Sequence, residues 1–319
     1  MTYGGDTVVA NLSTPITRSS LIRPTTFRDR LDLPRRTTLV GAGFVVVLVA
    51  LLLGFITWNG VQLFTSSGIP FLQIFSPTWA PDAGENTTFG LLPFILGTLG
   101  VMLVAAIIAT PLSIGLALFM SEIAPNWAKS ITRPAMEVFV GIPSVVYGWL
   151  GLTILVPFLR TNFHSLGFTV GFSWFAGSLV LALMILPTVT SISYDSFLAL
   201  PGDLRSASLA LGTTRWQTIR HILLRAASTG LLTAVVLGMM RAAGEALAVQ
   251  MVIGNRPIVP TALTQPVTTL TSQITLDMGN TVAGSAWNES LWTMGLVLVI
   301  ISFTFVAIVR RVARRGAMG

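Results

Sequence analysis

Residues 91–119, LLPFILGTLGVMLVAAIIATPLSIGLALF, contain no charged side chain. A helix that crosses the hydrocarbon core of a membrane needs about 20 mostly apolar residues, and this stretch is longer. The whole chain has the same character, since 53% of its 319 residues are hydrophobic and only 10% are charged. An average soluble domain has about 25% charged residues. The composition therefore predicts an all-α membrane protein.

Six segments are long and apolar enough to span a membrane. Three of them carry prolines, which spanning helices tolerate when neighbouring helices or hydroxyl groups satisfy the freed carbonyls. We therefore expect about six transmembrane helices, over 38–58, 91–119, 135–159, 173–195, 228–252 and 290–309.

Basic residues set the predicted orientation, because cytoplasmic membrane loops are enriched in Lys and Arg. The side opposite the basic regions has only Arg160 and Arg256. We expect both termini to be cytoplasmic, and the apolar run after the first tail is too long for a signal-peptide core. The predicted organisation is an Arg-rich tail over 1–36, a transmembrane domain over 37–312 and a short tail over 313–319.

Several chemistries are disfavoured by what the chain lacks. It has no cysteine and only two histidines, so we expect no metal site. Its only lysine, Lys129, follows an alanine and not the glycine of a phosphate-binding P-loop, so any ATP must bind another chain. No serine–histidine–aspartate set is recognisable, which argues against an enzyme. The net charge of +7 fits membrane loops better than a nucleic-acid partner.

Two full charges interrupt the fifth apolar segment, in GMMRAAGEALAVQMV (238–252). A charge at the centre of a membrane helix costs about 2.5–3.5 kcal/mol on insertion scales. Residues four apart share one helical face, so Arg241 and Glu245 are predicted to pair, which offsets part of that cost. Intramembrane ionisable residues indicate a transport pathway; a structural ion pair between helices is the alternative.

The stretch GIPSVVYG (141–148) is a second candidate for the pathway. Gly141 and Pro143 are predicted to interrupt the third helix and expose backbone groups. Ser144 and Tyr147 would then line the pathway as neutral hydrogen-bond partners. The alternative is a packing kink at a helix contact.

The segment 201–225, PGDLRSASLALGTTRWQTIRHILLR, has apolar residues at helical spacing and arginines on its polar face. Gly212 is predicted to separate two short helices. Such a segment either lies on the bilayer as an amphipathic helix or docks a cytoplasmic partner.

This segment resembles the EAA loop of ABC-importer permeases, which docks on an ATPase subunit. Aligned on Gly212, the chain matches that pattern at Ala207, Ile222 and Leu224 and departs from it at three positions. The resemblance implies ATPase coupling through Ala207, Leu211, Gly212, Ile222 and Leu224. The departures are Ser206, Ser208 and Arg225, which replace the usual Glu, Ala and Pro.

From about residue 38 onward the chain resembles the phosphate-specific permeases, and SEIAP (121–125) is most similar to the PstC type. The other similar motifs are FGLLPFILGTLGVMLVAAIIATPLSIGLALFMSEIAP (89–125), VGIPSVVYGWLGL (140–152), SLALGTTRW (208–216), RAAGEALAV (241–249) and VTTLTSQI (267–274).

The resemblance implies a type I ABC importer permease of the bacterial inner membrane. Its partners would be a PstA-like permease, two PstB-like ATPase subunits that hold ATP and Mg, a PstS-like phosphate-binding protein, and membrane lipid. Arg241 and Glu245 match the family residues implicated in transport. A guanidinium can bind two phosphate oxygens, and Glu245 would keep it from holding the anion too tightly. The alternatives are a permease for molybdate, sulfate or phosphonate, and a self-contained secondary transporter.

Overall fold

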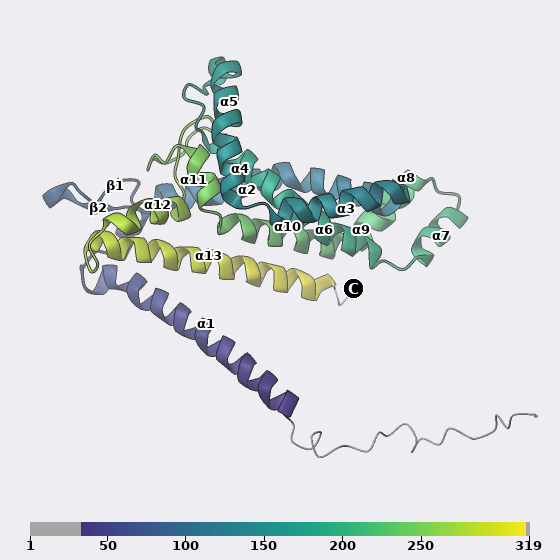
Figure 1. Ribbon diagram of the computed structural model, residues 1–319, viewed down its shortest axis with the longest axis horizontal. Coiled ribbons are helices and arrows are strands. Elements are labelled where there is room, and N and C mark those ends of the chain that lie inside the picture. The colour runs from purple at the N-terminus through teal and green to yellow at the C-terminus, as the bar shows by residue number, and fades with distance from the viewer. Residues whose placement is uncertain (1–32, 317–319) are drawn as a thin grey trace, which may run out of the picture. The chain divides into compact units, whose positions relative to one another are not determined.

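The computed structural model describes residues 33–316, most of which are helical (Figure 1). The chain forms two compact units, Met1–Gly54 and Phe55–Gly319. Helix α1 (Leu33–Thr65) belongs to both and is apolar enough to span a membrane from Thr37 to Thr65. Residues 1–32 of the predicted N-terminal tail and 317–319 of the predicted C-terminal tail lie outside the described residues, whereas 33–36 belong to α1 and 313–316 to α13.

Within the second unit, the end of α1 packs against α13 (Ala286–Gly316). The rings of Phe55 and Trp292 meet edge to face with centroids 5.3 Å apart. The Thr293 hydroxyl donates a hydrogen bond of 2.9 Å to the carbonyl of Gly60. A Cβ atom at Gly60 would lie 2.8 Å from the Cβ atom of Leu296. The two helices can therefore approach this closely because residue 60 has no side chain.

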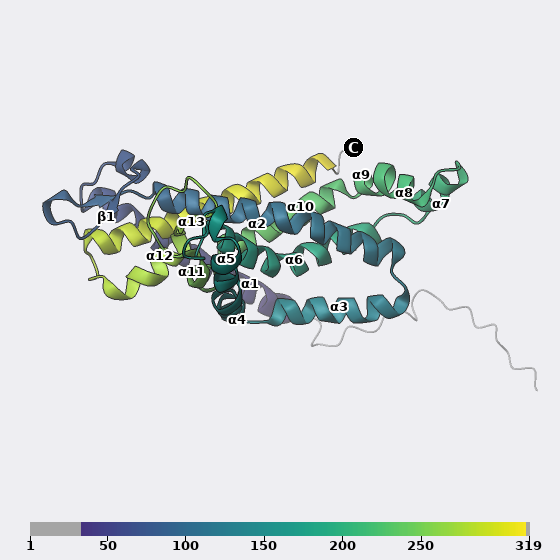
Figure 2. The same ribbon diagram turned by 90° about the horizontal axis from the view of Figure 1, so that it is seen from above.

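Three helices, α2 (Leu92–Leu118), α6 (Trp174–Leu198) and α10 (Ser228–Ala243), pack against one another and form the core (Figures 1 and 2). Helix α13 runs along α10. Small side chains at the contacts let the backbones come close; Ala105, Ala109, Ala182, Ala242 and Ala243 are buried in one cluster. The predicted all-α fold is confirmed.

Hydroxyl groups form hydrogen bonds beside the proline of α6. Pro187 lies inside α6, and the carbonyl of its neighbour Leu186 accepts two side-chain hydrogen bonds. Ser113 of α2 donates one at 3.1 Å and Thr190 of α6 donates the other at 2.8 Å. The first of these bonds joins two core helices, so the proline site is also a point of helix contact.

The third predicted span, 135–159, is wrong in its limits. Helix α3 (Asn126–Gly141) ends before Ile142, and a new helical run occupies Ser144–Asn162. That run consists of α4 (Ser144–Leu150), the π turn η6 (Gly151–Leu155) and α5 (Val156–Asn162). Figures 1 and 2 show it crossing the direction of α2, α6 and α10. The interruption comes at Ile142 and Pro143, because a proline disfavours helical conformation in the residue before it.

The fifth predicted span, 228–252, is also not one helix. Its first part is α10, and its last part is the separate helix α11 (Leu247–Ile253). The preceding segment consists of α7 (Asp203–Ala210), α8 (Arg215–Thr218), the π turn η8 (Ile219–Leu223) and α9 (Leu224–Ala226). The axis bends by 67° between Arg215–Ala226 and Ser228–Ala243.

The other elements lie in the connections. Between α1 and α2, a two-stranded antiparallel hairpin pairs β1 (Trp79–Ala80) with β2 (Thr88–Phe89). Helix α12 (Leu270–Asp277) follows α11 and packs against α13. The remaining turns are the 3₁₀ helices η3 (Phe71–Phe75), η4 (Gly84–Asn86), η7 (His164–Leu166) and η9 (Met278–Asn280), and the π turn η5 (Phe119–Ile123) that continues α2.

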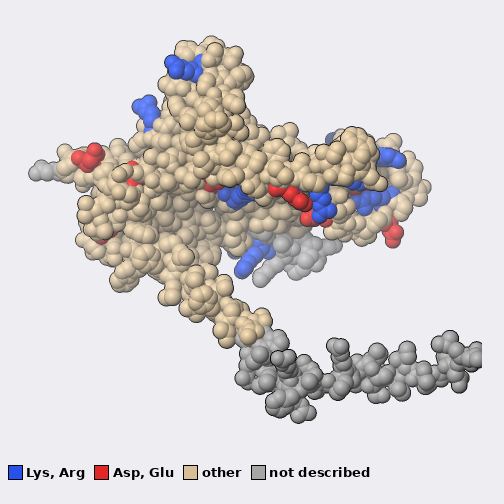
Figure 3. All heavy atoms as spheres, viewed as in Figure 1, with Lys and Arg blue, Asp and Glu red and all other residues tan. Residues whose placement is uncertain are grey.

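Five helices of the described chain are long and apolar enough to cross a membrane, or six if the bent pair counts as one span. The predicted number of about six equals the upper value. Figure 3 shows a face with few charges, on which basic side chains gather around α3, α7 and α8. The basic residues of these elements and their neighbours are Lys129, Arg133, Arg205, Arg215, Arg220 and Arg225.

Candidate functional site

The two charges of the fifth apolar segment lie at a break between helices. Helix α10 ends at Ala243 and α11 begins at Leu247, so Gly244, Glu245 and Ala246 are outside both. Glycine has low helix propensity. The Glu245 carboxylate accepts a hydrogen bond of 3.2 Å from the N–H of Ala248. It therefore satisfies one of the free donors at the start of α11.

The predicted ion pair between Arg241 and Glu245 is not formed. The ion pairs Arg205–Glu122 and Arg133–Glu137 are formed, and neither involves Arg241 or Glu245. The prediction was wrong because it assumed one continuous helix, and the helix ends between the two residues. Arg241 instead donates from Nη1 to the hydroxyl of Thr188 in α6, at 2.7 Å.

This hydrogen bond uses little of the capacity of Arg241. A guanidinium has five N–H donors, and Thr188 is the one hydrogen-bond partner of the Arg241 side chain within the described chain. The side chain is half-buried and lies in the last turn of α10, where a positive charge interacts favourably with the helix dipole. The structure thus holds a cation at the helix break without neutralising it.

Hydroxyl groups surround Glu245. A small cavity beside it is lined by Thr98 of α2, by Thr269 and Thr271, and by apolar side chains of α2, α6 and α10. Thr271 donates a hydrogen bond of 2.8 Å to the backbone carbonyl of Glu245. The N–H of Leu270 donates to the Thr98 hydroxyl at 2.9 Å. These bonds join α2, the helix break and the start of α12 in one polar cluster inside an apolar core.

The helix that begins at Ser144 lies against α11. A Cβ atom on Gly148 would come within 2.8 Å of Ala248 Cα, so α4 and α11 are in close contact. Tyr147 is buried, and its hydroxyl donates a hydrogen bond of 2.8 Å to the carbonyl of Phe139. The Ser144 hydroxyl is half-buried and has no hydrogen bond within the described part of the chain. Tyr147 thus links α3 to α4 near the break.

The second candidate region is the loop 201–225. Gly212 has φ +80°, which is the left-handed conformation that glycine adopts most easily. It ends α7, and the capping box formed by Thr214 and Gln217 begins α8. The buried hydroxyl of Ser208 lies 2.7 Å from that of Thr213 and 2.9 Å from that of Thr218. These bonds fix the angle between the two short helices that the sequence predicts.

The five predicted coupling residues differ in exposure. Ala207, Leu211 and Gly212 are exposed, and Leu211 has 83% of its surface accessible. Ile222 and Leu224 are half-buried, and Leu224 packs against the core cluster of Ala117, Phe197, Ala227 and Leu231. The turn at Leu211 and Gly212 therefore faces outward, while the end of the segment is anchored in the helix bundle.

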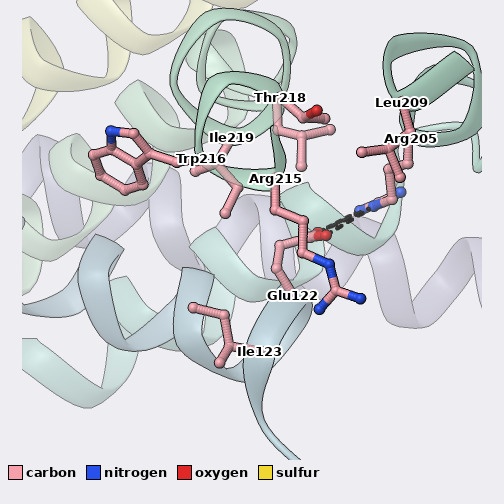
Figure 4. A pocket seen from close by; sticks show the side chains of 9 residues that line it. Glu122, Ile123, Arg205, Leu209, Arg215, Trp216, Thr218 and Ile219 are labelled. Atoms are coloured by element: carbon pink, nitrogen blue, oxygen red, sulfur yellow. Dashed lines mark hydrogen bonds and ion pairs between the residues drawn. The ribbon is translucent and has the colours of Figure 1, made fainter. Parts of the chain in front are cut away.

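A salt bridge attaches this loop to the end of α2. Arg205 of α7 binds Glu122 of η5 through both Nε and Nη2, with the shortest contact at 2.7 Å (Figure 4). The hydrogen bond with Glu122 raises the pKa of the Arg205 guanidinium above its usual range, against the opposing effect of burial. The pair forms one wall of a cavity of about 500 Å³, which also includes the exposed Trp216.

Sequence reasoning identified Arg241, Glu245 and Tyr147 but missed the hydroxyl groups that bond to the first two and the Arg205–Glu122 pair. A partial signal existed, because Thr98 and Thr188 are polar residues within apolar spans, and Glu122 lies at the end of one. The partners could not be assigned, because Arg241 and Thr188 are 53 residues apart and Arg205 and Glu122 are 83 residues apart.

Comparison with known proteins places the chain among membrane transport components. The family model of the binding-protein-dependent transport system inner membrane component matches residues 109–317. The chain is 51% identical over 262 residues to the probable ABC transporter permease protein YqgH of Bacillus subtilis (strain 168), covering 82% of this chain and 84% of that protein. It is 34% identical over 290 residues to the phosphate transport system permease protein PstC of Xylella fastidiosa (strain 9a5c), covering 85% and 87%.

A solved structure supports the fold. A chain of the MetNI methionine ABC transporter in inward-facing conformations matches with a TM-score of 0.55, over 71% of this chain and 95% of that chain. The sequence identity is 18%, so this likeness concerns the fold alone.

Proposed function

The chain belongs to the family of binding-protein-dependent transport system inner membrane components, and we propose that it conducts phosphate in an ATP-driven importer. It is a multi-pass protein of the inner membrane and an ABC importer permease subunit. As such it is the non-catalytic membrane component, and ATP is hydrolysed on a partner ATPase. An importer of this class also uses a binding protein and a second permease subunit.

The observation that supports this proposal is the hydrogen bonding of Arg241. Its charge lies at a helix break, and its one hydrogen-bond partner in residues 33–316 is the neutral hydroxyl of Thr188. The remaining donors of the guanidinium can bind two oxygens of a tetrahedral anion. A neutral partner holds the Arg241 side chain in place but leaves its positive charge for the anion. Phosphate is the anion because a relative such as the Xylella fastidiosa protein is a phosphate transport system permease.

Glu245 and the groups around it provide the second half of the proposed pathway. In the described conformation the carboxylate caps α11 and lines a small cavity with Thr98, Thr269 and Thr271. A carboxylate accepts a hydrogen bond from a protonated phosphate and repels a fully ionised one. We assign Ser144 and Tyr147 to the pathway wall as neutral groups, because α4 packs against α11 next to the break.

The loop 201–225 is the proposed contact with the ATPase. Leu211 and Gly212 form an exposed turn, and Ala207 is exposed one helical turn earlier. Ile222 and Leu224 carry the loop back into the bundle. In this proposal both termini are cytoplasmic, with tails over 1–36 and 313–319. The partners are a PstA-like permease, two PstB-like ATPase subunits and a PstS-like phosphate-binding protein.

The test is uptake by the complete complex in proteoliposomes. ATP-dependent accumulation of radiolabelled phosphate is expected, and it should require the binding protein. Accumulation of molybdate, sulfate or a phosphonate without phosphate would replace the proposed substrate. Transport by the chain without an ATPase subunit would contradict the assignment as an importer subunit.

A further inference from the structure

The pair Arg205–Glu122 joins three parts of the molecule. Both oxygens of Glu122 accept from Nε of Arg205 at 3.1 Å, and one oxygen also accepts from Nη2 at 2.7 Å. Arg205 further donates to the carbonyls of Phe197 and Leu200, at 3.1 Å and 3.5 Å. One guanidinium therefore connects the loop helix α7, the end of α2 and the end of α6.

The pair is built as a fixed contact. The Glu122 side chain is 14% exposed and that of Arg205 is 28% exposed. The ion pair Arg133–Glu137 is its counterpart on the surface, with a distance of 3.9 Å between the charged groups. Its side chains are 66% and 73% exposed, and both residues belong to α3. A fork-shaped guanidinium holds a carboxylate in one orientation, so the position of the loop relative to α2 is determined by this bond.

The loop has a second, covalent connection to the bundle. It follows α6, which ends at Leu198, and continues through α8, η8 and α9 into α10, across the 67° bend. Helix α10 carries Arg241, and α6 carries its partner Thr188. Without the Arg205 bond, a displacement of the loop would reach α6 and α10 through the chain itself and would have only packing contacts through which to reach α2. With the bond, all three core helices are attached to the loop.

We propose that Arg205 and Glu122 are positioning residues for energy coupling, which make the loop and the ends of α2 and α6 move as one body when the ATPase moves the loop. This rests on the proposed contact between the loop and an ATPase. The pair keeps α2 in step with α6 and α10, the helices that carry Thr188 and Arg241.

A distance measurement tests the common motion. The chain has no cysteine, so labels can be placed by Ile123→Cys, next to Glu122, and Ser206→Cys, next to Arg205. Both positions are exposed. Double electron–electron resonance on the full complex, nucleotide-free and ATP-bound, should give the same label distance in both states. Adding Glu122→Gln should make the distance depend on ATP. A distance that changes with ATP while the pair is intact would overturn the proposal.

Transport per ATP provides the functional readout. Glu122→Gln and Arg205→Lys should each lower phosphate uptake per ATP hydrolysed about tenfold, while ATPase subunits still co-purify. The double exchange Glu122→Arg with Arg205→Glu should recover part of this loss. Glu137→Gln is the matched control, because it removes an exposed pair that joins no two elements. Unchanged coupling in both single variants would contradict the proposal.

The outcomes separate this inference from the proposed function. If no ATPase subunit co-purifies with the unaltered chain, the proposed contact between the loop and the ATPase is wrong. If it recovers the ATPase but carries another oxyanion, the label distances still decide whether the loop and α2 move together. If the single variants assemble poorly, the labelled complex with the intact pair gives the answer alone.

Discussion

Two arginines of this chain are held in opposite ways. Arg205, in the loop before α8, binds a carboxylate through two nitrogens and donates to two carbonyls at the end of α6. Arg241, at the end of α10, donates to one neutral hydroxyl, that of Thr188, within the described chain. The first guanidinium is nearly saturated by its own protein, whereas the second keeps most of its donors.

The difference teaches how to separate a structural charge from a functional one. A partly buried guanidinium that meets a carboxylate in bidentate geometry is neutralised and fixed, and it serves the fold or the transmission of motion. A charge in a membrane helix that the protein leaves without a counter-ion is a candidate for ligand contact.

Arg241→Ala should reduce phosphate uptake about 100-fold, because it removes two charge-assisted hydrogen bonds to the anion. Arg241→Lys should retain more uptake, since the charge remains but the fork is lost. Uptake in proteoliposomes, normalised to assembled complex, is the measurement. Unreduced uptake by a correctly assembled Arg241→Ala complex would remove Arg241 from the pathway.

Glu122→Ala should lower stability by about 2 kcal/mol, because it leaves Arg205 partly buried without a counter-ion. Thermal unfolding of the purified complex in detergent measures this, with Glu137→Ala as the control. The control should change stability by less than about 0.5 kcal/mol, since its pair is exposed. Equal effects of the two variants would mean that Arg205 is not anchored as the structure indicates.

Gly212→Ala should lower the free energy of unfolding by about 1 kcal/mol, because the φ of +80° at this position is unfavourable for a residue with a Cβ atom. No atom lies within 4 Å of the Cβ position, so the cost comes from the backbone and not from a clash. Gly212→Asn should be milder, since Asn tolerates this conformation. Recovery of the ATPase with each variant measures the effect on the loop that Arg205 anchors. Equal losses for Ala and Asn would point to a contact of Gly212 itself.

Thr188→Val should lower phosphate uptake by roughly threefold to tenfold, because the hydrogen bond that holds Arg241 is worth about 1 kcal/mol. Thr188→Ser keeps the hydroxyl and should behave like the unaltered protein. The apparent affinity for phosphate delivered by the binding protein is the quantity to measure in both. A loss as large as that of Arg241→Ala would show that Thr188 contacts the anion itself.

Much of the fold could be predicted because its causes are local. An apolar run of more than 20 residues forms a spanning helix whatever surrounds it, so 91–119 and 173–195 correspond closely to α2 and α6. Gly212 ends a helix because of its own conformational freedom. The errors arose at 135–159 and 228–252, because an apolar composition indicates that a segment lies in the membrane but not that it forms one continuous helix. Hydropathy alone joins these segments; the sequence predicts the interruption at Gly141 and Pro143 but not the one at Gly244.

By itself, then, the sequence determined that this is a helical membrane protein with a structured loop at 201–225, and that Arg241 and Glu245 lie in an apolar segment. The partners depend on how the helices pack: Thr188 binds Arg241, the start of α11 binds Glu245, and Glu122 binds Arg205. The physical reason is that helices form from contacts a few residues apart, whereas a side chain finds its partner through the packing of segments 53 or 83 residues away.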